Sequence, residues 1–209
     1  MRRRAKLIVD FAFIAAACAA VTSVAAIGQT LSGDDLAKAL QRGGYVIVMR
    51  HASSPSEPPT QQMANPDNVH RERQLDEKGR VTATAMGQAL LRLRIPIGQV
   101  YTSPTYRALE TVRLAGLPNA QTVGDLGDGG QSMKGVTQSQ AEWLRKKAEE
   151  FHSGRNTIIV THSPNITRAF PRWSSGLTDG EALILGSDGK GGMVLIGRIK
   201  IEDWPRLRP

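Results

Sequence analysis

Residues 45–51 read Tyr-Val-Ile-Val-Met-Arg-His, a continuous apolar run that ends in an arginine and a histidine. Such a run, bounded by two glycines and a polar loop, predicts a strand that is buried on both faces of a sheet. Residues 157–162, Thr-Ile-Ile-Val-Thr-His, repeat the pattern and also end in a histidine. Ligands sit beyond the carboxyl ends of strands in parallel sheets, so the two strand ends predict a functional site.

Segments with helical periodicity alternate with these strands. Helices are expected over residues 30–41, 77–93, 103–114 and 138–151, and further strands over residues 100–102, 182–185 and 193–199. Ser103 and Pro104 are expected to begin the third helix as N-cap and first helical residue. The alternation predicts a three-layer α/β/α sandwich around a mostly parallel sheet. Residues 52–74 and 118–135 are expected to be long loops, which are usually functional or mobile.

The N-terminal segment has the order of a secretory signal. Residues 2–6 carry four basic side chains, residues 7–26 form a mostly apolar run, and this run ends in Val-Ala-Ala. A basic start, an apolar stretch and small residues at the end are typical of a cleaved signal peptide. We expect cleavage after Ala26, which leaves residues 27–209 as a single domain with no membrane span, in the periplasm or secreted. A retained membrane anchor is the alternative.

Composition narrows the classes of partner. The formal net charge is +8, from 27 basic and 19 acidic residues. Without residues 1–26 it is +5, from 23 basic and 18 acidic residues. A basic protein favours anionic partners, but much of the excess lies in the signal segment, and no nucleic-acid partner is expected.

The cysteine and histidine content also excludes several kinds of site. Cys18 is the only cysteine and lies inside the signal segment. The mature chain therefore has no disulfide, no thiolate nucleophile and no cysteine-type zinc site. The four histidines show no close ligand spacing on one helix face, so neither a metal nor another cofactor is expected.

The pair Arg50-His51 suggests phosphoryl chemistry. A neutral histidine at a strand end can present one ring nitrogen as a nucleophile while the other donates to a backbone carbonyl. Attack on phosphorus would give a phosphohistidine, and the charged phosphoryl oxygens then require fixed cationic donors. The planar fork of Arg50 matches phosphate geometry. Arg107 and His162 are the other candidate donors.

Four blocks of sequence resemble the histidine phosphatase superfamily, which includes the cofactor-dependent phosphoglycerate mutases. Residues 48–52, Val-Met-Arg-His-Ala, resemble its Arg-His-Gly signature, with Ala52 in place of the glycine. Residues 73–79 are similar to its Arg-x-Leu-Thr-x-x-Gly helix start, residues 102–111 to its Ser-Ser-Pro-x-x-Arg-Ala-x-x-Thr block, and residues 160–163 to its second-histidine strand. The blocks follow the order of the family, in its branch 1, and the chain resembles exported members similar to SixA.

The resemblance implies a phosphoglycerate mutase-like fold and hydrolysis of phosphate monoesters without a metal. It implies that His51 is the nucleophile and that Arg50, Arg107 and His162 bind the phosphate. It also implies a carboxylic acid that protonates the leaving oxygen and later activates water.

Three carboxylates are candidates for this acid. Asp125 is preferred for its position relative to the glycines that follow it, and Asp128 lies on the same loop. Glu181 is a rival, because some members of the family carry a Gly-Glu pair before a late strand.

The leading hypothesis is therefore an exported phosphomonoesterase acting on a phosphorylated small molecule or a cell-envelope component. One alternative is a non-catalytic module of the same fold that binds phosphate ligands. Two others are a mutase and a phosphatase of lipopolysaccharide sugar phosphates. The sequence names neither the physiological substrate nor the oligomeric state.

Overall fold

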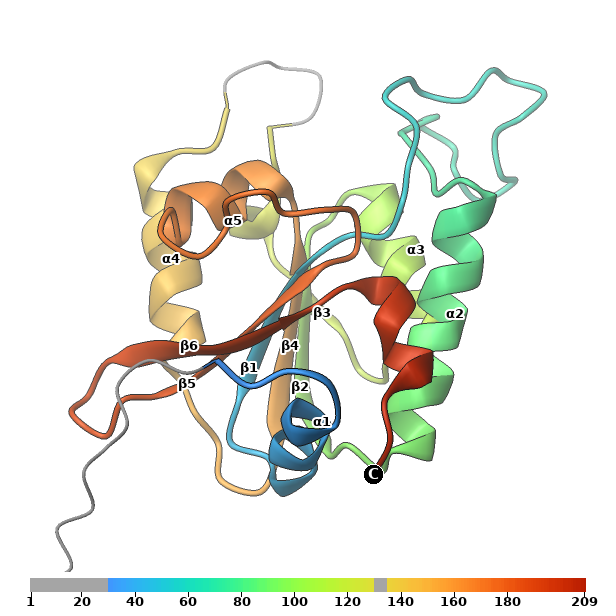
Figure 1. The fold of residues 1–209 in the computed structure, drawn as a ribbon. Helices are drawn as coiled ribbons and strands as arrows, with labels where there is room; N and C mark the ends of the chain where they lie inside the picture. Colours follow the sequence, from blue (N-terminus) through green and yellow to red (C-terminus); the bar gives the residue numbers. More distant parts are fainter. Residues whose placement is uncertain (1–29, 130–134) are drawn as a thin grey trace, which may run out of the picture.

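A computed structural model describes residues 30–129 and 135–209, in which one six-stranded sheet lies between two layers of helices (Figure 1). The strand order is β3-β2-β4-β1-β5-β6. The strands are β1 (Val46–Arg50), β2 (Ile97–Thr102), β3 (Gln121–Thr122), β4 (Asn156–Thr161), β5 (Ala182–Ser187) and β6 (Met193–Ile199). The helices are α1 (Gly33–Arg42), α2 (Glu77–Arg92), α3 (Tyr106–Leu114), α4 (Gln138–Ala148) and α5 (Ser163–Ala169), with short 3-10 helices η1 (Gly124–Leu126) and η3 (Ile201–Arg206). The expected three-layer α/β/α sandwich is confirmed.

The pairing of the strands decides which side chains meet. β1 pairs parallel with β4, with Arg50 opposite Thr161, so both strands end at the same edge of the sheet. β2 and β3 continue this parallel part on the far side of β4. β5 runs antiparallel to β1, with Ala182 opposite Met49, and β6 runs antiparallel to β5. The beginning of β5 therefore lies beside the end of β1.

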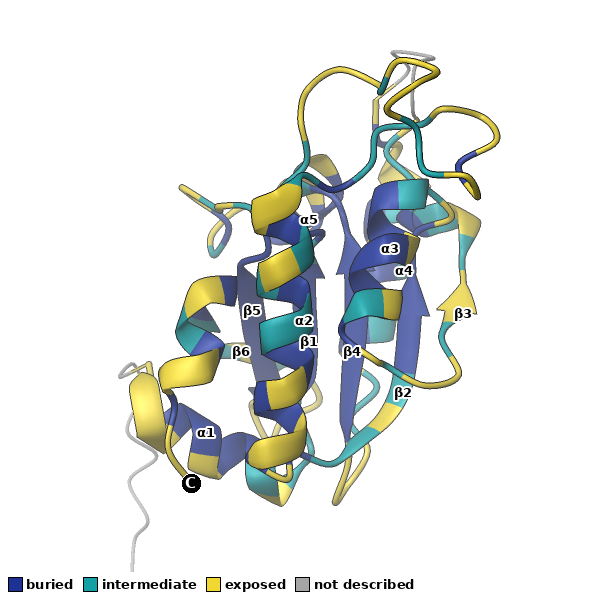
Figure 2. Ribbon diagram, turned by 90° about the vertical axis from the view of Figure 1, so that its right-hand side faces the viewer, coloured by how far each residue is buried: buried dark blue, intermediate teal, exposed yellow. Residues whose placement is uncertain are grey.

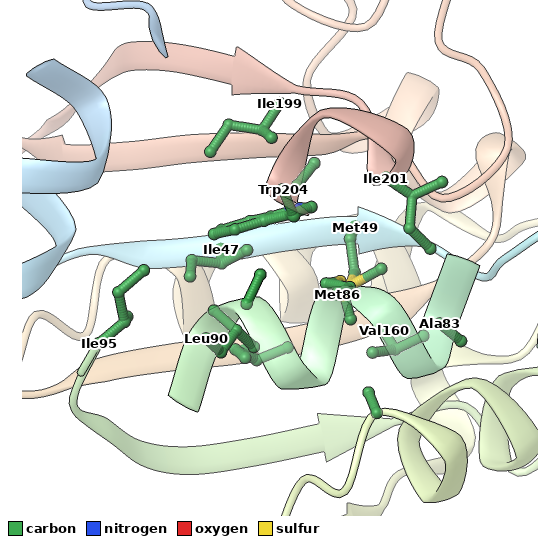
Figure 3. Close-up of a cluster of buried hydrophobic side chains, with 14 of the residues drawn as sticks. Ile47, Met49, Ala83, Met86, Leu90, Ile95, Val160, Ile199, Ile201 and Trp204 are labelled. Atoms are coloured by element: carbon green, nitrogen blue, oxygen red, sulfur yellow. The ribbon is translucent and has the colours of Figure 1, made fainter. Parts of the chain in front are cut away.

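Alternate residues of the buried strands supply two separate cores. Ile47 and Met49 pack with α1, α2 and α3 on one face, while Val46 and Val48 pack with α4 and α5 on the other. Figure 3 shows the first core, where the indole of Trp204 lies over β1. The helices turn their exposed residues outward, and the central strands β1, β4 and β5 are almost entirely buried, whereas the edge strand β3 is exposed (Figure 2). Continuous apolar runs are the pattern expected of such doubly covered strands.

The start of α3 differs from the prediction. Ser103 is not the N-cap, because its backbone N–H donates to the carbonyl oxygen of Val160 at 3.0 Å and prolongs the contact of β2 with β4. The helix begins at Tyr106 with Thr105 as its N-cap. The hydroxyl of Ser103 lies 2.8 Å from His162 Nε2 at the neighbouring strand end, and it also accepts from the backbone N–H of Thr105 at 3.3 Å.

The N-terminal predictions fall outside the described part of the chain. The expected signal peptide of residues 1–26, with Cys18, and part of the second long loop, residues 130–134, lie outside the described residues. None of the helices within residues 30–129 and 135–209 has the length and hydropathy needed to cross a membrane.

Gly87 brings α2 into direct contact with the chain at the end of α3. A Cβ atom at this position would lie 2.1 Å from the backbone oxygen of Ala115. Two helices must separate to admit it, so we expect Gly87→Ala to lower the free energy of unfolding by about 1–3 kcal/mol. Urea denaturation measures this. A matched control is Gly124→Ala, where the added Cβ meets nothing within 4 Å. Equal losses in both variants would contradict the packing argument.

Candidate active site

The two strand-end histidines meet at the carboxyl edge of β1 and β4. His51 follows β1, and its backbone N–H donates to the carbonyl oxygen of Thr161 at 3.0 Å. His162 follows β4 and caps the start of α5. The two rings lie edge to face, with 5.2 Å between their centroids. Both side chains are buried, at 3% and 1% exposure, although both are polar.

The ring of His51 is held in one tautomer. Its Nδ1 lies 2.8 Å from the carbonyl oxygen of Ala52, which can only accept, so Nδ1 carries the proton. The other nitrogen, Nε2, keeps its lone pair. Burial lowers the pKa of His51 well below its ordinary value, and the neighbouring His162, Arg107 and Arg50 lower it further. A neutral ring with one unprotonated nitrogen is the form that a nucleophile requires.

Ala52 fits the position at which the family signature has glycine. Its side chain is fully buried, and its backbone N–H donates to the hydroxyl of Thr111 at 3.1 Å. The backbone at Ala52 does not adopt a positive φ, the conformation that favours glycine. The substitution therefore leaves the end of β1 in an ordinary conformation.

Arg107 connects the two histidines. From the second residue of α3, its Nε donates to His51 Nε2 at 3.1 Å, and its Nη2 donates to His162 Nδ1 at 3.1 Å. The same Nη2 forms an ion pair with Asp128. Only 5% of this arginine is exposed. We call these four residues, His51, Arg107, Asp128 and His162, the histidine cluster.

His162 is also neutral in this arrangement. Because Arg107 can only donate, Nδ1 of His162 accepts and Nε2 carries the proton, which points to the Ser103 hydroxyl at 2.8 Å. Burial lowers the pKa of His162 to about 3 against the opposing effect of Asp128, and Arg107 adds to the lowering. Both rings thus stay uncharged near neutral pH.

The structure separates the three candidate acids. Asp128 is joined to Arg107, and its Oδ2 lies 3.5 Å from His162 Nδ1. Asp125 lies in η1, half-buried, and within the described residues no hydrogen bond or ion pair links its carboxylate to the histidine cluster. Of the three, Asp128 is therefore the carboxylate that the fold brings to the histidines.

Glu181 is engaged elsewhere. Its Oε1 accepts from Arg198 Nε at 2.7 Å, and its Oε2 accepts from the backbone and the hydroxyl of Thr178, both at 2.9 Å. Burial raises the pKa of Glu181, but these hydrogen bonds outweigh it and hold the pKa below the usual range. A carboxylate kept ionised in this way is a poor source of protons.

Arg50 contributes a second cation to the same strand end. Its Nη2 lies 2.6 Å from Asp179 Oδ1, on the segment that leads into β5. Its Nε is buried and has no hydrogen-bond partner among the described residues. An unpaired buried donor costs about 1–3 kcal/mol, so this N–H is suited to an incoming anionic oxygen.

A third guanidinium belongs to this region. Arg73, on the returning arm of the 52–74 loop, donates from Nε to the carbonyl oxygen of Pro55 at 2.6 Å. Burial lowers the pKa of Arg73, and the positive charges of Arg107 and Arg50 lower it further. Three arginines near two neutral histidines give this region a positive charge that attracts an anion.

No metal centre accompanies these groups in residues 30–129 and 135–209. In that part of the chain no three side chains of the histidine, cysteine, aspartate and glutamate types gather closely enough to hold an ion.

Part of the sequence and the fold are similar to those of known phosphatases. Residues 46–126 match the family model of the histidine phosphatase superfamily (branch 1). A solved structure of the protein histidine phosphatase SixA with tungstate superposes with a TM-score of 0.56 at 17% identity, covering 76% of this chain and 98% of that one. A SixA structure from Agrobacterium tumefaciens gives 0.52 at 15% identity, with 75% and 98% covered. No curated protein sequence matches the chain.

The fold is that of the phosphoglycerate mutase-like neighbours, and two histidines and an arginine lie at one edge of its sheet. Residues 46–126 are similar to branch 1 of the histidine phosphatase superfamily, and the fold is similar to that of the SixA structures. A phosphoserine phosphatase from Entamoeba histolytica shares the fold, with a TM-score of 0.52 at 14% identity over 76% of this chain and 98% of that one.

The buried neutral histidines predict a loss of stability in acid. An unfolded histidine takes up a proton near pH 6.5, whereas the folded His51 and His162 resist it. The unfolded chain therefore binds more protons below about pH 6.5. As the pH decreases from there, the free energy of unfolding falls by up to about 1.4 kcal/mol per pH unit for each ring. Urea denaturation at about pH 7.5 and about pH 5 measures the slope. In His162→Gln the slope becomes shallower, and an unchanged slope would show that this ring does not contribute.

Proposed function

We propose that this protein is a metal-independent phosphomonoesterase that works through a phosphohistidine on His51 and is exported to the periplasm. The observation that carries the proposal is the state of the His51 ring. Its Nδ1 proton is fixed on Ala52 and its Nε2 lone pair lies beside Arg107 Nε, 3.1 Å away. A ring held in this way is prepared for attack on phosphorus, because proton removal is not needed first.

In the first step the Nε2 lone pair of His51 forms a bond to phosphorus while the bond from phosphorus to the ester oxygen breaks. Arg107 and Arg50 donate to the phosphoryl oxygens, with the unpaired Nε of Arg50 as the readiest donor. Charge stabilisation of this type supplies much of the rate enhancement in phosphoryl transfer. In the second step water attacks the phosphohistidine, inorganic phosphate leaves, and His51 returns to its neutral form.

Asp128 is the proposed proton donor in place of Asp125. It lies beside Arg107 and His162, the two groups proposed to bind the phosphate. The arginine favours the ionised carboxylate, but an arriving phosphate dianion offsets that positive charge and favours the protonated form. The protonated Asp128 then donates to the leaving oxygen, and its carboxylate takes a proton from the attacking water.

Leaving-group dependence tests this role. We expect Asp128→Asn to lower kcat on an alkyl phosphate by about 10²-fold or more, because a poor leaving group needs the proton. On a nitrophenyl phosphate, whose leaving group needs little protonation, the loss is far smaller. Asp125→Asn and Glu181→Gln should show no such difference between the two substrates. The same difference between the two substrates in either of those variants would identify that residue as the proton donor.

Metal independence has a direct test. An aryl phosphate assay in excess EDTA should retain its rate, and acid-quenched protein should carry acid-labile phosphate. Complete loss of activity on chelation, restored by added metal, would overturn the proposed mechanism.

The substrate class is proposed more broadly. The solved relatives include a protein histidine phosphatase and a phosphoserine phosphatase, and the loops that would select a substrate differ freely within one fold. A panel of phosphohistidine, phosphoserine, sugar phosphates and lipopolysaccharide fragments discriminates among them. Binding of these ligands without any turnover would favour the alternative of a non-catalytic phosphate-binding module.

Export rests on the basic and apolar order of residues 2–26. Fractionation of cells that express the full chain, with N-terminal sequencing of the product, tests it. A mature N-terminus at Ile27 in the periplasmic fraction is expected, and an uncleaved cytosolic protein would contradict it.

A further inference from the structure

The segment before β5 reaches the end of β1 through Asp179. Its carboxylate pairs with Arg50 at 2.6 Å, in a position that is one-third exposed. The pair is ionic in character, since Asp179 Oδ1 makes no hydrogen bond within the described residues. Arg50 is thus held through Nη2, while its Nε has no acceptor among the described residues.

Two backbone contacts fix this segment to the proposed nucleophile. The N–H of Gly180 donates to the carbonyl oxygen of His51 at 2.9 Å, and the N–H of Arg50 donates to the carbonyl oxygen of Glu181 at 3.1 Å. Asp179 therefore lies in a segment bonded to both residues of the Arg-His pair. These backbone hydrogen bonds fix the position of Asp179 relative to Arg50.

Glu181 and Arg198 hold the segment before β5 through hydrogen bonds and an ion pair. Glu181 binds both the backbone and the hydroxyl of Thr178, and Arg198 binds Glu181. Arg198 also donates to the carbonyl oxygens of Trp173, at 3.2 Å, and Ser175, at 2.8 Å. The ion pair of Glu181 with Arg198 thus connects β6, the segment before β5 and the chain at residues 173–175. This gives Glu181 a structural role that does not require proton transfer.

We infer that Asp179 is a positioning residue: it holds the fork of Arg50 in place and, through its negative charge, keeps the binding of phosphate weak enough for the product to leave. This inference rests on the proposed function, in which Arg50 contacts the phosphoryl group. It adds a residue that neither the sequence motifs nor the family match assigns.

Two opposing effects follow from removing the charge of Asp179. Loss of the ion pair costs little, since partly exposed pairs contribute little to stability, and an asparagine oxygen can still contact Arg50. Loss of a negative charge beside a phosphate dianion relieves a repulsion that, at an effective dielectric near 20, amounts to more than this. The second effect is the larger, so Asp179→Asn should bind phosphate more tightly.

Calorimetric titration of the purified protein with inorganic phosphate tests the inference. We expect Asp179→Asn to lower the Kd by about fivefold to tenfold, and to lower kcat as release slows. Asp179→Glu keeps the charge and should return the Kd to within about twofold of wild type. The matched control is Asp203→Asn, which removes an aspartate paired with Arg206 at 3.1 Å on the surface, and it should leave the Kd unchanged.

The outcomes separate this inference from the proposed function. Unchanged or weaker phosphate binding in a folded Asp179→Asn protein overturns the inference, whether or not wild type is active. Tighter binding in that variant, with no turnover by wild type on any phosphate ester, supports the inference as a statement about the anion site and overturns the enzyme. Urea denaturation of each variant shows that the fold is retained.

Discussion

Replacement of His51 by alanine should abolish phosphate ester hydrolysis, with a loss in kcat/KM on the order of 10⁴-fold or more. The reason is that Nε2 of His51, in a neutral ring whose tautomer is fixed, is the atom proposed to accept the phosphoryl group. Arg107 donates to this atom from Nε and to His162 Nδ1 from Nη2, but His162 Nδ1 also lies 3.5 Å from the Asp128 carboxylate, whose negative charge disfavours an incoming phosphoryl group there. Nothing in the cluster replaces the lost lone pair.

The measurement is a steady-state assay on an aryl phosphate, joined to acid-quench trapping of the phosphoprotein. His152→Ala is the matched control, because His152 is exposed and lies outside the cluster. It should keep full activity and the trapped phosphate. A His51→Ala protein that still hydrolysed the ester at a tenth of the wild-type rate would require another nucleophile.

The second large effect is expected at Arg107. Arg107→Lys should lower kcat by about 10²–10³-fold, although the charge is kept. One guanidinium contacts His51, His162 and Asp128 at once, through two of its nitrogens. A lysine ammonium is a single point donor and cannot hold this fork geometry. The position and orientation of both rings would relax together.

Arg113→Lys provides the control on the same helix. Its side chain is 63% exposed, and it approaches Glu110 at only 3.9 Å, so little activity should be lost. Circular dichroism and urea denaturation establish that each variant is folded. Activity of Arg107→Lys within threefold of wild type would mean that only the positive charge of this residue matters.

The sequence predicted the position of the two strand ends and their histidines well, for a physical reason. Apolar runs over residues 45–49 and 157–160, each bounded by polar segments, predict buried strands, and a histidine follows within two residues of each. Parallel pairing of two such strands then places the side chains at one edge, and the structure confirms this with Arg50 opposite Thr161. The three-layer class follows from the alternation of helices and strands.

The identity of the carboxylate partner could not be read in the same way. Asp125 and Asp128 lie three residues apart in a glycine-containing loop, and no periodicity says which one turns toward the histidines. The turn of η1 and the chain after Leu126 decide it, because they carry Asp128 to Arg107. Glu181 was a reasonable rival by position, but its partner Arg198 lies on β6, 17 residues away in the sequence.

By itself, the sequence determined the layered fold, the two buried strands and the three residues, Arg50, His51 and His162, that their ends present. Local periodicity encodes these features, since each depends on a run of neighbours. Tertiary structure alone decided that β5 runs antiparallel beside β1, which brings Asp179 to Arg50, and that Asp128 reaches Arg107. Strand direction and loop path depend on packing between distant segments, and no local pattern records that packing.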